Sequence, residues 1–148
     1  MISEKTLARY DRIALRAHKA GFKAAKAKAR QIVRENDAET IITRTPGKTY
    51  AHRVIGLPCG FCHLSFTSGR IGFFQYLKAH AHAYTSPYYG ARAHFDSITH
   101  RLGVKDEPVH PKHRYLTQSL RVNEAYYEAV VSVLNKAGID CSFGSTID

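Results

Sequence analysis

Residues 5–34 read KTLARYDRIALRAHKAGFKAAKAKARQIVR and carry the strongest structural signal of this chain. The stretch holds no proline, and its many alanines, lysines and arginines are strong helix formers. Ser3 stands just before it, as a favourable N-cap residue. A helix of this length would extend for about 45 Å, more than the width of a small domain. The sequence therefore predicts a long N-terminal helix, which we expect to bend at Gly21 rather than to protrude.

Positive charge lies along one side of this predicted helix. At 100° per residue, nine cations fall within an arc of about 100°, three or four residues apart. These nine residues, which we call the basic stripe, are Lys5, Arg9, Arg12, Arg16, Lys19, Lys23, Lys26, Arg30 and Arg34. The opposite side is made mostly of small residues such as Ala14, Ala17 and Gly21, which is unlike a membrane-surface helix. No apolar stretch is long enough to span a bilayer, so we expect no membrane partner.

The net charge of +10 is concentrated at the N-terminal end of the chain. Residues 1–36 hold ten lysines and arginines against three carboxylates, whereas residues 37–148 hold twelve against nine. Solvated helix faces usually mix charges of both signs, because like charges three or four residues apart repel. A row of cations instead suits a nucleic acid, whose duplex carries one phosphate charge about every 1.7 Å. The sequence thus predicts contacts to the DNA or RNA backbone, by an accessory protein of a viral or ribonucleoprotein assembly. A plain solvated face, or an inhibitor that docks on an acidic protein, is the alternative.

The rest of the chain predicts a single α+β domain, since 148 residues fall well short of the length at which chains split. Residues 37–148 form its core, and residues 1–36 are an extension of the same domain. We expect a small antiparallel or mixed sheet. The predicted elements before residue 103 are a hairpin at 40–45 and 49–55 around Pro46-Gly47, a strand at 61–66, and helices at 71–81 and 88–102.

The C-terminal tail predicts a β-α-β unit. Its first strand is expected at 115–119, its helix from Asn123 to the stop at Gly138, and its last strand over the alternating apolar residues of 139–143. In this helix Val130 and Leu134 should face the sheet, while Glu124 and Glu128 should face water.

Aromatic residues with basic neighbours could assist nucleic-acid binding, because bases stack on such rings beside cations. Tyr50 and Arg53 lie on the predicted hairpin, and Tyr88 and Tyr89 follow Pro87. The alternative is that these tyrosines half-bury their rings in the core and keep their hydroxyls wet.

Histidines favour a second class of function. Eight of the nine histidines lie between His52 and His113, and His63-Leu-Ser65 matches one half of a two-histidine phosphodiesterase pattern. A small histidine-dependent phosphodiesterase or nucleotide-processing enzyme is therefore the enzymatic alternative. Its candidate catalytic residues are His63, Ser65, His94 and Glu128.

The three cysteines bear on metal binding and on the cell compartment. Cys59-Gly-Phe-Cys62 could supply two zinc ligands, and His80 and His82 could complete the set. Because a single Cys-x-x-Cys unit is weak evidence for zinc, we expect two structural cysteines and no cofactor. Three cysteines cannot all pair within the chain, and the charged N-terminus does not resemble a secretory signal. We therefore expect a cytoplasmic protein.

Overall fold

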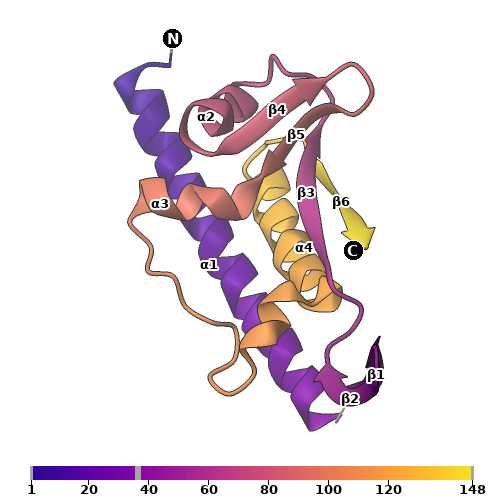
Figure 1. Ribbon diagram of the computed structural model, residues 1–148. Helices are drawn as coiled ribbons and strands as arrows, with labels where there is room; N and C mark the ends of the chain where they lie inside the picture. Colours follow the sequence, from indigo (N-terminus) through magenta and orange to yellow (C-terminus); the bar gives the residue numbers. More distant parts are fainter. Residues whose placement is uncertain (1, 36–37, 148) are drawn as a thin grey trace.

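The computed structural model of the chain describes residues 2–35 and 38–147, with the backbone alone for 38–45 and 50–54. Figure 1 shows the arrangement of its helices and strands. The elements are, in order, α1 (Glu4–Arg34), β1 (Ala38–Thr45), β2 (Lys48–Ile55), β3 (Gly60–Phe66), α2 (Gly72–His80), β4 (His82–Ser86), β5 (Gly90–His94), the 3-10 helix η1 (Phe95–Ile98), α3 (Thr99–Leu102), the 3-10 helix η2 (Arg114–Gln118), α4 (Leu120–Lys136) and β6 (Ser142–Ile147).

Helix α1 confirms the predicted long N-terminal helix, but the expected bend at Gly21 is wrong. The helix runs for 31 residues without interruption, and the Ser3 hydroxyl caps it by accepting a hydrogen bond from the Thr6 backbone N–H. Gly21 is buried instead against α4. A Cβ atom at this position would come within 2.7 Å of the Tyr126 ring and 2.8 Å of Val130. Glycine therefore allows two helices to approach closely, and the long helix lies flat along the molecule rather than protruding (Figure 1).

The predicted hairpin is confirmed in its backbone. Strands β1 and β2 pair antiparallel from Ala38 and Ile55 to Thr45 and Lys48, so that Pro46 and Gly47 form the turn. Gly47 has a φ of 79°, a left-handed conformation that suits glycine. The hairpin is a two-stranded sheet of its own, near the C-terminal end of α1 in Figure 1.

The core is built on a four-stranded antiparallel sheet in the order β4-β5-β3-β6. From β3 onward the main elements run β-α-β-β-α-β, the split β-α-β topology of ferredoxin-like domains. Helix α2 packs on β4 and β5, α4 packs on β3 and β6, and α1 packs on α4. The predicted α+β class is confirmed. Three layers result, with the sheet on one side, α2 and α4 in the middle, and α1 on the far side (Figure 1).

The helix predicted at 88–102 is wrong over most of its length. Residues 90–94 form β5, which pairs with β3 and with β4, and helical structure begins only at η1. Ala91 and Ala93 are buried while Arg92 between them is partly exposed, which is the two-residue period of a strand. The prediction failed because the apolar residues at spacings of three and four span two different elements.

The predicted β-α-β tail is correct only in its helix and its last strand. Residues 114–118 form η2 instead of a strand, and only Ser119 makes an isolated bridge, to Cys59. Strand β6 pairs antiparallel with β3 and spans Ser142–Ile147, so it overlaps the predicted strand at 139–143 only in the last two residues of that prediction. Helix α4 begins at Leu120 rather than at Asn123, whose side chain donates a hydrogen bond to the Gly60 carbonyl.

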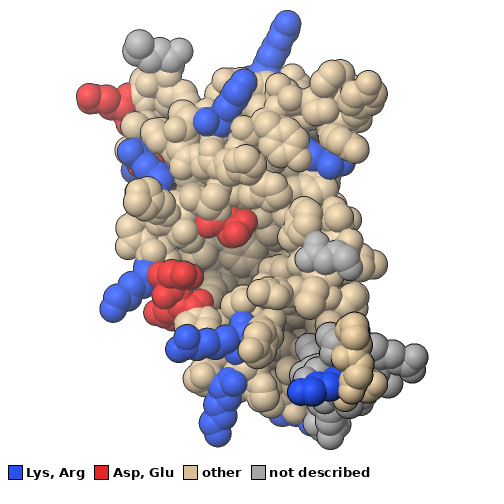
Figure 2. Space-filling model, in the orientation of Figure 1, with Lys and Arg blue, Asp and Glu red and all other residues tan. Residues whose placement is uncertain are grey.

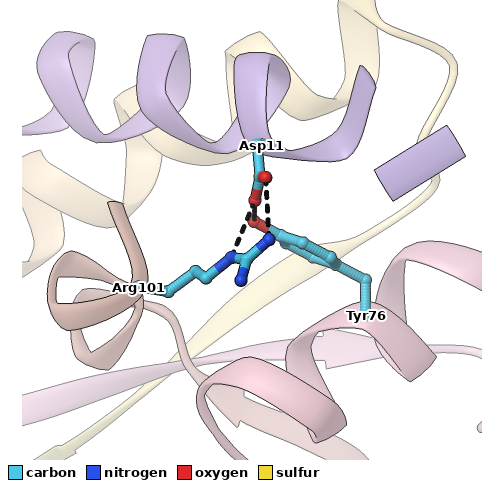
Figure 3. Close-up of polar contacts among 3 residues, drawn as sticks. All are labelled: Asp11, Tyr76 and Arg101. Carbon is cyan, nitrogen blue, oxygen red and sulfur yellow. Dashed lines mark hydrogen bonds and ion pairs between the residues drawn. The ribbon is translucent and has the colours of Figure 1, made fainter. Parts of the chain in front are cut away.

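A partly exposed polar network ties the long helix to the connection between β5 and α4 (Figure 3). The Tyr76 hydroxyl of α2 donates to Asp11 of α1 at 2.6 Å, and Arg101 of α3 donates from Nη2 to Asp11 at 3.1 Å. Burial alone would raise the pKa of Asp11. The hydrogen bonds and charge of Arg101, together with the Tyr76 bond, outweigh burial and lower this pKa below its ordinary value. The network fixes α3 against α1.

Candidate nucleic-acid interface

The basic stripe is presented on the outer side of α1. Eight of its nine residues are exposed, and Lys26 is half-buried with its ammonium group 4.8 Å from the centre of the Phe22 ring. The side of α1 that packs on the core is made of Ile13, Ala14, Ala17, His18, Gly21, Ala25, Ala29 and Ile32. Because small residues bring α1 close to the core, the charged side chains point away from the body of the protein. Figure 2 shows one face of the molecule, with single Lys and Arg side chains that project at its margin.

No stripe cation forms an ion pair with a carboxylate of the described residues, although Asp106 and Glu107 line a cavity of about 280 Å³ together with Lys19, Lys23 and Lys26. The two ion pairs of that part of the chain join Arg101 to Asp11 and Arg121 to Glu35, and neither involves a stripe residue. The cations therefore remain available to an external polyanion over about 44 Å of helix, from Lys5 to Arg34 at 1.5 Å per residue.

Of the hairpin and loop residues that were predicted to assist the stripe, the structure describes the side chains of Tyr88 and Tyr89. The side chains of Tyr50 and Arg53 lie outside the part of the molecule that is described. Tyr88 and Tyr89 are 90% and 62% exposed and lie at the turn between β4 and β5, which Figure 1 shows well away from α1. The Tyr89 ring lies 4.4 Å from the Arg92 guanidinium, so it belongs with the sheet.

A second polar surface covers the side of the sheet that faces away from α2 and α4, which we call the open face. Strand alternation and pairing place on it Phe61, His63 and Ser65 of β3, His82 and Tyr84 of β4, Arg92 and His94 of β5, and Ser142 and Thr146 of β6. Three of the four residues of the enzymatic alternative therefore share a surface. The fourth, Glu128, is exposed on α4, behind the sheet.

His63 is the buried member of the open face. Its ring lies over Gly144 of β6, where a Cβ atom would come within 2.8 Å of Nε2, so glycine provides the space for the ring. Burial lowers the pKa of His63, and the neighbouring charges of Arg92 and His94 lower it further. His63 is therefore a neutral imidazole beside Arg92.

The residues of the zinc alternative are not assembled. Cys62 is buried on the helix side of the sheet, where its sulfur lies 3.6 Å from the Ser145 hydroxyl, whereas His82 is on the open face. Within residues 2–35 and 38–147, no cluster of three or more His, Cys, Asp or Glu side chains could hold a metal ion. All three cysteines are free thiols.

The sequence did not indicate a cavity that has a volume of about 770 Å³. It lies between α1, α4, the start of β3 and the connection after β5. His18 and Tyr126 share a hydrogen bond of 2.7 Å in its wall, and the Tyr127 hydroxyl donates to Asp96 at 2.9 Å. Asp106 and Glu107 also line the cavity. Figure 2 shows carboxylates in the middle of the face that it draws. Such a lining is ill suited to a polyanion.

No protein-family model, curated protein or solved structure matches this chain. None of the helices in the described residues is long and apolar enough to cross a membrane.

Proposed function

We propose that this protein binds nucleic acid by contacts of the basic stripe with backbone phosphates. The observation that carries the proposal is the row of outward-facing cations on α1, without ion-pair partners in the described part of the chain. A rigid helix holds the backbone of these residues in place before binding, so that binding does not have to order the chain segment that carries them. Phosphate contacts position a protein without reading bases, so little sequence preference is expected.

The test is the salt dependence of duplex binding, measured by fluorescence anisotropy with a labelled 20-base-pair duplex. If about five stripe cations contact phosphates, log K should fall with log salt at a slope near −4.5. Replacing Arg12, Arg16, Lys19 and Lys23 by Gln should reduce the slope to about −1.

A matched control separates the position of the charges from their number. Replacing Lys48, Arg70, Lys78 and Lys136 by Gln removes the same charge from exposed positions outside the stripe. This variant should keep most of the slope. An equal loss in both variants would mean that net charge alone drives binding, and a wild-type slope of zero would reject the function. A stoichiometric complex with an acidic protein that survives nuclease would favour the interaction alternative.

A further inference from the structure

The open face is unusual in its charge. Strands β3, β4, β5 and β6 contain no aspartate or glutamate, although they supply His63, His82, His94 and Arg92. The split β-α-β topology puts α2 and α4 on the other side, so none of the described helices packs on this surface. An uncovered surface with hydrogen-bond donors and one cation, Arg92, but without carboxylates in its strands is complementary to an anion.

Aromatic rings cross the open face from strand to strand. The rings of His82 and His94 are stacked with centroids 5.1 Å apart and planes 15° apart, and the Phe61 ring lies 6.1 Å from His94. These three rings come from β4, β5 and β3, and the Tyr84 ring lies within 6.4 Å of His94. Phe61 is 45% exposed, although large apolar side chains are usually buried. The row therefore offers ring surface to a planar ligand.

Arg92 supplies a positive charge beside the rings. Its guanidinium lies 4.4 Å from the centre of the Tyr89 ring, which fixes the orientation of the group. The Arg92 Nε is buried and has no hydrogen-bond partner within the described residues. A guanidinium held in this way can donate its terminal N–H groups to a phosphate oxygen.

We propose that the open face is a binding site for single-stranded nucleic acid, with unpaired bases stacked on Phe61, His82 and His94 and a phosphate bound by Arg92. A row of rings beside a cation matches a strand in which planar bases alternate with anionic phosphates. A duplex is excluded because its bases are already stacked and paired. The site goes beyond phosphate binding by the basic stripe and does not depend on it, since α1 and the open face lie on opposite sides of the molecule (Figure 1).

The experiment compares three labelled probes of equal charge by fluorescence anisotropy. They are a mixed-sequence single strand of twelve nucleotides, in RNA and DNA versions, an abasic strand with the same number of phosphates, and a blunt hairpin duplex. The stripe variant with Arg12, Arg16, Lys19 and Lys23 replaced by Gln is the main background, because it removes competing phosphate binding. In this background the base-containing strand should bind at least about fivefold more tightly than the abasic strand. The RNA and DNA arms show whether the 2′-hydroxyl contributes.

Variants assign the preference to the ring row. Phe61→Ala and, separately, His82→Ala should each reduce affinity for the base-containing strand about fivefold and leave abasic binding unchanged. Both side chains are exposed, so the fold should survive, as circular dichroism will verify. Tyr115→Ala is the matched control, since Tyr115 is 74% exposed and lies on η2, outside the open face.

Three outcomes would overturn the proposal. These are equal binding of base-containing and abasic strands, unchanged single-strand affinity in natively folded Phe61→Ala and His82→Ala proteins, and displacement of the strand by poly-glutamate as readily as by unlabelled strand. The last result would indicate an acidic protein as the partner. Each can occur while the wild-type duplex keeps its salt slope, so failure here is distinguishable from failure of the stripe function.

Discussion

Gly21→Ala is the substitution that tests how α1 is held. Alanine is the better helix former by about 1 kcal/mol, so the change would stabilise a helix that merely bends or flexes at this point. In the structure, however, the new Cβ would meet the Tyr126 ring at 2.7 Å and Val130 Cγ2 at 2.8 Å. Neither partner can easily retreat, because Val130 is fully buried and Tyr126 is held by its hydrogen bond to His18. Overpacking of this kind costs about 1–3 kcal/mol.

The expected balance is a loss of up to about 2 kcal/mol in the free energy of unfolding. Urea denaturation followed by circular dichroism at 222 nm measures this loss. An unchanged m-value would show that the substitution alters stability and not the surface exposed on unfolding. Ala8→Gly, at an exposed position of the same helix, measures the effect of helix propensity alone. It should lower the free energy of unfolding by about 1 kcal/mol. An increase in stability for Gly21→Ala would refute the close packing of α1 on α4 and restore the bend.

Two further predictions concern stability. Leu134→Ala removes a fully buried side chain and should lower the free energy of unfolding by about 2–5 kcal/mol in a urea titration. Glu128→Ala, at an exposed position, should change it by no more than about 0.5 kcal/mol. A loss of catalysis without loss of stability in Glu128→Ala would instead support the enzymatic alternative. Burial lowers the pKa of His18 below 6.5, despite the opposing charge of Asp96, so the folded state holds the neutral ring. The unfolded chain then binds more protons below pH 6.5, and the melting temperature should fall as the pH drops from 7 to 5. His18→Gln should flatten this dependence without abolishing it, because the pKa of His63 is lowered too; equal pH slopes in both proteins would contradict the assignment.

The sequence predicted best those helices and strands whose conformation depends only on residues close together in the chain. The long helix could be predicted because thirty residues of strong helix formers also divide into a cationic side and a small-residue side. The hairpin followed from Pro46-Gly47 between two β-branched runs. Val130, by contrast, faces α1 at Gly21 rather than the sheet as expected, because no local pattern indicates that a helix covers α4.

Surfaces that depend on pairing between distant segments could not be predicted. Strands β4 and β5 have only five residues each, too few to show a two-residue period against the helical spacings around them. Without these strands, His82, His94 and Phe61 are three unrelated positions. Likewise His18 lies 108 residues from its partner Tyr126, and no local pattern connects this isolated histidine with a cavity.

The positions of the charges bear on how the two proposed sites would work together. The cavity lies between them, since it is lined by His18 and Phe22 on the flank of α1 and by Phe61 and His94 at the edge of the open face. Asp96, Asp106 and Glu107 line the same cavity, so a strand that passed from the stripe to the open face would carry its phosphates past three carboxylates. This repulsion favours two separate segments of nucleic acid over one continuous strand. The stripe would then hold one segment by its backbone while the open face holds the bases of another, which suits a protein that bridges paired and unpaired regions.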